Sequence, residues 1–276
     1  MKRTNIISEI LRYLVIIALA ALFLAPLLWM LAASVSNVEE IGKARFLFVP
    51  KKIDLANYRY ALTLMPFGRY FLNTCLVTGL GIAGTLISSS MAAYAFARLK
   101  APGKQGVFLL VLSTLMLPAM VTCVPQFVIF KSLGMYDTLW PLILPSFFGN
   151  ALYIFLFRQF FLTIPAELED AARLDGCSTW QVYLKILMPL SKPVAVSVMV
   201  FAFVGYWNDF MTPLIYLNSV ENRTLALGLA TFSDVQGVDI VSLMAASTVT
   251  LLPVVILFFV AQKFFVKGVV TTGIKG

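Results

Sequence analysis

Six runs of roughly 20 mostly apolar residues recur along this chain of 276 residues, and they constrain its fold more than any other feature. A helix of that length crosses the hydrocarbon core of a bilayer. The chain is 60% hydrophobic and 12% charged, whereas a soluble domain is about 45–50% apolar and about 25% charged. We therefore predict an all-α, polytopic membrane protein with six transmembrane helices. The predicted spans are about 13–33, 71–95, 107–130, 138–157, 194–217 and 242–261.

The basic residues predict how these spans are oriented. Lys and Arg are enriched in cytoplasmic flanks, where they anchor beside anionic lipid heads, so the net charge of +8 does not require a nucleic-acid partner. If both termini are cytoplasmic, thirteen of the 21 basic residues lie inside. Six of the other eight share one loop, 34–70. We expect a multi-pass membrane protein, a single transmembrane domain over 1–276, with both termini inside and a cytoplasmic tail at 263–276.

The composition argues against chemistry by this chain alone. It has no histidine, which removes the commonest metal ligand and general base. Its three cysteines, Cys75, Cys123 and Cys177, show no metal-binding spacing and are interpreted as small packing residues. No phosphate-binding Walker A loop is present, since "GKQ" at 103–105 lacks the upstream glycine and the Ser or Thr. We expect no enzyme activity, no catalytic residue and no metal site; any ATPase must be another chain.

The segment "GLGIAG" at 79–84 matches a dinucleotide-binding pattern only by its letters. Such a site needs a strand before it, a helix after it and an acidic residue about 20 positions further on. Here the glycines lie inside an apolar run. Gly84, Ser88 and Ala92 recur at every fourth residue, a pattern that lets another helix approach closely.

A compact charged segment interrupts the apolar runs between the fourth and fifth spans. In "PAELEDAARLDGCSTWQ", residues 165–181, the acidic residues Glu167, Glu169 and Asp170 suit the positive end of a helix. Asp175 and Gly176 are expected to end that helix, and Ser178 or Thr179 to cap a second one. A helix lying flat on lipid would prefer basic and bulky apolar faces. We predict a cytoplasmic helix–turn–helix, the coupling segment (about 163–190), that fits a groove in another protein.

The sequence "ELEDAARLDGCSTWQVYLKILMPL" resembles the EAA signature of ABC importer permeases. In that family this segment is the coupling helix that docks in a cleft of the ATPase subunit. The resemblance assigns ATPase coupling to Glu169, Asp170, Ala171, Ala172, Asp175 and Gly176, with Asp170 in place of the usual Glu. It implies the type I importer permease fold.

Further segments in the same order, among them "AAYAFARLKAPGK", "YWNDFMTPLIYL" and "GVVTTGIKG", resemble the carbohydrate-uptake branch of these permeases, in particular the smaller permease of maltose-type importers. The resemblance implies sugar or oligosaccharide import. It also implies four kinds of partner: a second related permease, two copies of an ABC ATPase, an extracytoplasmic sugar-binding protein and the lipid bilayer. No cofactor is expected in this chain, because ATP and Mg²⁺ would be bound by the ATPase.

Polar and aromatic residues within the predicted spans, most of them in the outer half of the fifth span, are candidates for the translocation path. Asp209 is the only acidic residue within a predicted span, and a carboxylate facing lipid costs about 2.5–3.5 kcal/mol, so it should face the interior or a wet cavity. Aromatic rings pack on the C–H faces of sugars, and amides and carboxylates bond their hydroxyls. The candidates are Asn73, Tyr206, Trp207, Asn208 and Asp209. A helix-packing role for Asn208 and Asp209 is the alternative.

Two other classes of function remain open at this stage. A stand-alone carrier or channel would transport without ATP, although one intramembrane carboxylate is few for an ion relay. A membrane scaffold would need no polar groups at mid-membrane. Purifying the chain with co-expressed neighbours separates the three, because only an importer permease brings an ATPase with it.

Overall fold

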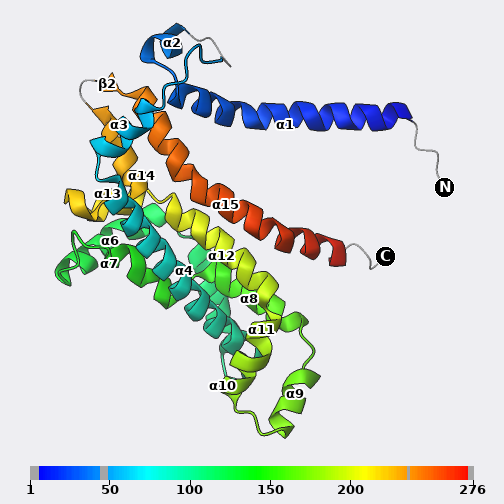
Figure 1. Cartoon of the computed structure of the whole chain (residues 1–276). Helices are drawn as coiled ribbons and strands as arrows, with labels where there is room; N and C mark the ends of the chain where they lie inside the picture. The colour runs from blue at the N-terminus through cyan, green and yellow to red at the C-terminus, as the bar shows by residue number, and fades with distance from the viewer. Residues whose placement is uncertain (1–5, 44–48, 235–236, 273–276) are drawn as a thin grey trace. The chain divides into compact units, whose positions relative to one another are not determined.

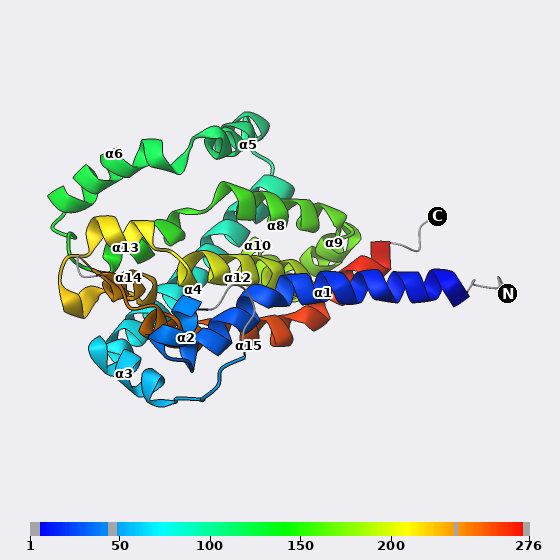
Figure 2. The same ribbon diagram turned by 90° about the horizontal axis from the view of Figure 1, so that it is seen from above.

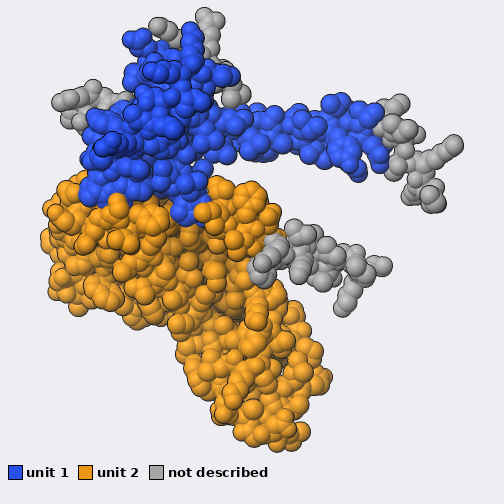
Figure 3. Space-filling view, viewed as in Figure 1, with its two compact units in different colours: residues 1–67, 228–253 blue, residues 68–227, 254–276 orange. Residues whose placement is uncertain are grey.

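In the computed structural model, which describes residues 6–43, 49–234 and 237–272, the chain forms two compact units. One unit contains residues 1–67 and 228–253, and the other contains 68–227 and 254–276 (Figure 3). We describe each unit by itself.

The first unit joins the N-terminal part of the chain to the first part of the last helix. Its elements are α1 (Ile6–Ser34), α2 (Val38–Lys43), α3 (Ala56–Leu64), the 3-10 turn η5 (Ala230–Phe232), the two-residue strands β1 (Ser233–Asp234) and β2 (Gly237–Val238), and the start of α15 (Ile240–Thr272) (Figure 1). The two strands pair antiparallel. Because α15 continues to Thr272, the expected tail at 263–276 is helical for its first ten residues, and 273–276 lie outside the described residues.

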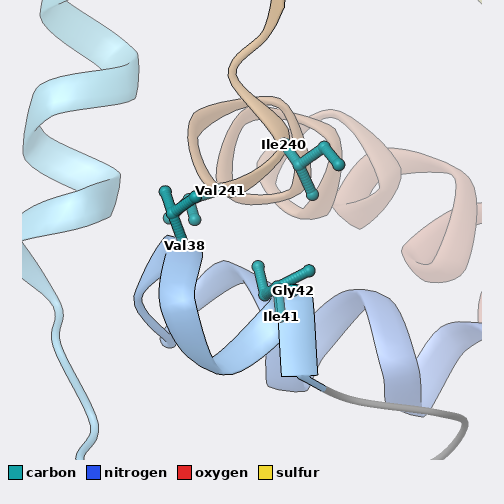
Figure 4. Close-up of a pocket in the computed structure, with 5 residues that line it drawn as sticks. All are labelled: Val38, Ile41, Gly42, Ile240 and Val241. Carbon is teal, nitrogen blue, oxygen red and sulfur yellow. The ribbon is translucent and has the colours of Figure 1, made fainter.

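Hydrogen bonds tie the C-terminal end of α1 to α3. The Ser34 Oγ and Tyr58 Oη atoms are 2.7 Å apart, and the Asn57 side chain donates to the carbonyls of Ser34 and Ser36. The same unit contains an apolar hollow of about 240 Å³ between α2 and the start of α15 (Figure 4). It is lined by Val38, Ile41, Gly42, Ile240 and Val241.

The second unit contains the middle of the chain and is a bundle of helices. Its elements are α4 (Phe67–Arg98), α5 (Lys104–Ser113), η1 (Thr114–Met116), α6 (Ala119–Ser132), α7 (Trp140–Ile143), η2 (Leu144–Phe148), α8 (Ala151–Thr163), α9 (Glu167–Leu174), α10 (Thr179–Val182), the π-helical turn η3 (Tyr183–Leu187), α11 (Met188–Leu190), α12 (Lys192–Trp207), α13 (Met211–Tyr216), η4 (Val220–Asn222) and α14 (Leu225–Leu229).

Four helical stretches in the described residues are long and apolar enough to span a membrane: Ser8–Ser34, Phe67–Arg98, Trp140–Thr163 and Ile240–Gln262. They cover the predicted first, second, fourth and sixth spans. Two further pairs qualify only when joined across a bend, Lys104–Met116 with Met120–Ser132 and Thr179–Leu190 with Lys192–Trp207. The polytopic helical fold is therefore as predicted, and the number of spans is six if each bent pair counts as one.

The prediction of one continuous helix over 107–130 is wrong. The chain bends by 102° between the two halves, and Figure 2 shows α5 and α6 as separate helices. The cause is Pro118, whose ring disfavours helical backbone at the preceding residue. Leu117 is accordingly extended, with φ −81° and ψ 118°.

The predicted span 194–217 is also interrupted and is not one continuous helix. Helix α12 ends at Trp207 and α13 begins at Met211. Polar side chains satisfy the backbone at this break: the Asn208 amide donates to the Val204 carbonyl (2.9 Å), and Asp209 Oδ1 accepts from the Thr212 N–H (3.1 Å). Pro213 also removes a backbone donor, so an unbroken helix would be penalised here.

The small residues of α4 allow another segment to approach closely, as the sequence predicted. A Cβ atom added at Gly84 would lie 2.8 Å from the Phe147 ring. Ser88 donates to the Ser146 carbonyl at 2.8 Å. One turn earlier, a Cβ at Gly81 would lie 2.8 Å from the ring of Tyr206. Helix α4 thus packs against η2 and α12 at distances that only glycine permits.

The main core of the second unit lies where α4, α8 and α12 meet the coupling segment. Its buried side chains are Ala93, Tyr94, Phe108, Ile154, Phe157, Phe161, Ile164, Tyr183, Leu187, Val194 and Val198. Because Ile164, Tyr183 and Leu187 belong to the coupling segment, that segment is packed into the bundle.

Asp137 organises the loop between α6 and α7. Its backbone has a positive φ of 58°, a conformation that Asp and Asn tolerate better than most residues. Its carboxylate accepts hydrogen bonds from the Ser219 hydroxyl and from the backbone N–H groups of Asn218 (2.8 Å) and Ser219 (2.9 Å). Burial raises the pKa of Asp137, but these hydrogen bonds outweigh it and lower the pKa from 3.8 to about 2.

This pKa predicts a pH-dependent stability. Because the folded-state pKa is depressed, the stabilisation is fully present above about pH 4 and is lost as the pH falls through about 2. Asp137→Asn keeps the shape and tolerates the positive φ. We expect it to lower the free energy of unfolding by about 1–2 kcal/mol at pH 7, because the charged hydrogen bonds are lost.

Thermal unfolding of the detergent-solubilised protein at pH 7, 4 and 2.5 would measure this effect. The difference between the variant and the wild type should shrink between pH 4 and 2.5. Glu167→Gln, which removes an exposed carboxylate, is the matched control and should show little change. A deficit of equal size at all three pH values would contradict the electrostatic explanation.

Candidate coupling site

Helix α9 has an inward and an outward face. Glu169 and Ala172, three residues apart, are buried, at 5% and 6% exposed. Asp170, Ala171 and Arg173 are exposed. The helix therefore attaches to the rest of the chain by one side and presents the other to its surroundings.

The end of α9 is a left-handed turn at Gly176, which has φ 82°. The Gly176 N–H donates to the Arg173 carbonyl (3.1 Å) and the Cys177 N–H to the Ala172 carbonyl (2.9 Å). These two bonds define a Schellman motif, which satisfies carbonyls that a helix end leaves open. The predicted stop at Asp175 and Gly176 is confirmed.

The second helix of the coupling segment starts with a capping box. The Ser178 hydroxyl accepts from the Gln181 N–H (3.3 Å), and the Gln181 side chain accepts from the Ser178 N–H (2.8 Å). The predicted capping at Ser178 is therefore confirmed. The helix continues through the π-helical turn Tyr183–Leu187 to Leu190, so the helix–turn–helix extends up to the start of α12.

A buried ion pair fixes the inward face of α9 to the end of α4. The Arg98 Nε and Glu169 Oε1 atoms are 2.8 Å apart, and the two side chains are only 12% and 7% exposed. Arg98 also donates through Nη2 to the carbonyls of Phe161 (2.6 Å) and Ile164, at the C-terminal end of α8. One guanidinium group thus joins α4, α8 and α9.

The outward side of the coupling segment carries apolar side chains. Leu174, in the last turn of α9, is 89% exposed. Leu168 and Trp180 are also exposed. Neither Leu174 nor Trp180 was among the residues assigned to coupling from the sequence. Leu174 could have been recognised because it directly precedes the Asp175-Gly176 stop. At that position a leucine is not needed for packing within the chain.

The six residues assigned to coupling all lie on α9 and its C-terminal turn. Asp170, Ala171, Asp175 and Gly176 are exposed and form part of the outward surface. Glu169 and Ala172 face the chain itself, so their contacts within the chain are structural. The outward set, with Leu174, is the surface that a partner could contact.

The candidate path residues occupy two separate places. Asn73, near the start of α4, donates to the carbonyls of Glu221 (2.8 Å) and Arg223 (2.9 Å) and therefore holds that loop. The other four surround the break between α12 and α13. The Tyr206 hydroxyl lies 3.0 Å from Thr85 Oγ1, and the buried Trp207 stacks on Phe203. The side chains of Asn208 and Asp209 form hydrogen bonds with the local backbone.

A hollow of about 250 Å³ lies between α6 and α13, close to this break. Its polar lining includes Thr122, Gln126, Thr212 and Tyr216. Among the described residues, no group of three or more His, Cys, Asp or Glu side chains is placed to hold a metal ion.

These features define a class of protein: a helical membrane protein that packs one face of a short polar helix against its bundle and exposes apolar side chains on the other face. The family of the "Binding-protein-dependent transport system inner membrane component" matches residues 84–271. The chain belongs to this family, whose members are membrane-spanning permease subunits of ABC transporters.

Individual relatives agree with this assignment. The chain is 36% identical over 252 residues to the probable ABC transporter permease protein YurM of Bacillus subtilis, covering 91% of this chain and 83% of the relative. It is 34% identical over 282 residues to the arabinooligosaccharides transport system permease protein AraQ of Halalkalibacterium halodurans, covering both chains completely. A bacterial ABC transporter that imports the polysaccharide alginate has a chain of the same fold, with a TM-score of 0.84, 24% identity and coverage of 96% and 99%.

Proposed function

We propose that the chain forms half of the translocation path of an importer for a sugar or oligosaccharide, driven by ATP hydrolysis on a separate subunit. The observation that carries the proposal is helix α9, buried on one face and exposing Leu174 on the other. Several relatives are named as permeases for carbohydrates, including arabinooligosaccharides and lactose. Family membership favours this function over a stand-alone carrier or channel.

The partners follow from this role. A second related permease would complete the path, two ATPase copies would bind the two coupling segments, and an extracytoplasmic binding protein would deliver the sugar. Both termini and the coupling segment would then lie in the cytoplasm, and the membrane would be the bacterial cytoplasmic membrane. ATP and Mg²⁺ would be bound by the ATPase, so this chain would perform no chemistry.

The mechanism needs only two arrangements of the helices. When ATP closes the ATPase dimer, the clefts that hold the coupling segments move, and the attached spans rock between inward-open and outward-open states. The outward side of α9 supplies the contact through Leu174, Asp170 and Ala171, and Gly176 sets the turn. The buried face of α9 transmits the movement to the bundle.

Co-purification tests the proposal. The tagged chain, expressed with the proteins encoded beside it, should bring down an ATPase with Walker A and B motifs and a second permease. A chain that purifies alone and moves sugar in liposomes without ATP would contradict the proposal and favour a carrier.

The role of Asp209 in the path is a separate prediction. It sits at the break between α12 and α13, partly buried, where its carboxylate caps α13. In a complex lacking Cys75, Cys123 and Cys177, a Cys introduced by Asp209→Cys should react with a small polar thiol reagent in one nucleotide state and be protected in the other. Equal protection in both states would leave Asp209 only its capping role.

A further inference from the structure

Three polar side chains on α4 face the coupling segment. Ser90, Tyr94 and Arg98 follow each other at four-residue intervals, so they lie on one side of the helix over its last turns. Figure 1 shows α10 close to this end of α4.

Each of the three contacts a different part of the coupling segment. Arg98 pairs with Glu169 on α9 (2.8 Å). The Tyr94 hydroxyl donates to the Thr179 carbonyl at the start of α10 (3.3 Å). The Ser90 hydroxyl lies 2.7 Å from the Tyr183 hydroxyl in the π-helical turn. The coupling segment is thus fixed to α4 at both of its helices.

The ion pair is the charged one of these attachments. Arg98 and Glu169 are both mostly shielded from water, so removing one partner would leave a buried charge without compensation. The planar guanidinium also reaches two carbonyls at the end of α8. A lysine would keep the charge but not this fork of donors.

The opposite end of α4 holds a different loop. Asn73 donates to the Glu221 and Arg223 carbonyls, and the Thr74 hydroxyl accepts from the Leu225 N–H (2.9 Å). Between the two ends α4 is one unbroken helix of 32 residues, about 48 Å long at about 1.5 Å per residue. Its middle is locked against η2 and α12 through Gly84 and Gly81.

We propose that α4 is a strut that carries movement of the coupling segment to the loop 217–225 at its other end. Arg98 is the positioning residue that joins α4 to the coupling segment. This proposal rests on the proposed function and deepens it. The strut would let the ATPase state change the surface that the loop presents on the far side of the membrane.

A reporter at the far loop tests the strut. Val220 is exposed, and a Cys introduced there by Val220→Cys, with Cys75, Cys123 and Cys177 replaced, can be labelled in the assembled complex. We expect its labelling rate to differ between the nucleotide-free and ATP-bound states. With Arg98→Lys, the ratio of the two rates should fall at least about fivefold, the lower range of ordinary coupling between sites. ATPase binding should remain.

Two further variants control for folding and for the substitution itself. Arg158→Lys makes the same change on α8, where Arg158 donates to the Phe96 carbonyl (3.4 Å) and lies over the Phe108 ring without joining the coupling segment. It should leave the ratio unchanged. If Arg98→Glu and Glu169→Arg each prevent assembly, the charge-swapped double variant should restore assembly and at least part of the response.

The outcomes separate the two proposals. The strut would be overturned, and the importer function left standing, by an unchanged ratio of labelling rates in Arg98→Lys. The same conclusion would follow if a complex with Arg98 intact imports sugar while the labelling rate of its Val220→Cys reporter is the same with and without ATP. A chain that binds no ATPase would overturn the importer function, and the strut with it.

Discussion

Complexes that carry Gly176→Val are expected to assemble in the membrane but to lose sugar-stimulated ATP hydrolysis by tenfold or more. Gly176 has φ 82°, which a β-branched residue avoids at a cost of about 1–3 kcal/mol. Nothing lies within 4 Å of a Cβ placed there, so the substitution acts through the backbone rather than by collision. The Schellman turn would rearrange, and α9 and α10 would no longer hold their mutual angle.

Gly103→Val is the matched control for this prediction. Gly103 has φ 72°, and its Cβ position is also free of neighbours, but it lies in the loop between α4 and α5. It imposes the same backbone penalty away from the proposed docking surface. Hydrolysis rates with and without substrate would be measured in both variants. Equal loss in both would show a general stability effect, and full stimulation in Gly176→Val would contradict the role of the turn.

Replacing Leu174 by aspartate is expected to weaken ATPase binding by roughly 10–100-fold. A leucine buried at an interface contributes about 1.5–3 kcal/mol, and every 1.4 kcal/mol is a factor of ten in affinity. Because Leu174 is 89% exposed in the isolated chain, its loss should not disturb the fold. The carboxylate would also have to be desolvated on docking.

The measurement is the amount of ATPase retained by the detergent-purified permease pair across a series of ATPase concentrations. Val49→Asp is the control, since Val49 is 88% exposed and lies in the loop expected on the other side of the membrane. It should leave ATPase retention unchanged. Wild-type retention by Leu174→Asp would exclude Leu174 from the docking surface.

The sequence predicted the type of fold well because long apolar runs and glycine stops are local signals. Gly176 and the cap at Ser178 could be read directly, since each depends on the residues beside it. The breaks in the two interrupted spans could not be predicted from the sequence in this way. Pro118 and Pro213 were visible and each disfavours a continuous helix, but the size of the bend depends on how the neighbouring segments pack.

The direction in which each residue of α9 faces was equally hidden. Glu169 and Asp170 are adjacent acidic residues with similar sequence signals, yet Glu169 is buried against Arg98 and Asp170 is exposed. Arg98 lies 71 positions before Glu169, so no local pattern links them. Similarly, Ala172 is packed inside the chain and Ala171 is exposed, so Ala172→Asp would disturb folding rather than report on docking.

The central claim is that this chain is a permease that transports only when a separate ATPase drives it. It is tested most directly by reconstituting the chain with its partner permease, the ATPase and the binding protein in liposomes and measuring uptake of a labelled oligosaccharide. The account predicts accumulation that requires ATP on the side of the coupling segment and stops when the ATPase is omitted or carries a Walker A substitution. Transport by the chain without the ATPase, or at the same rate without ATP, would contradict it.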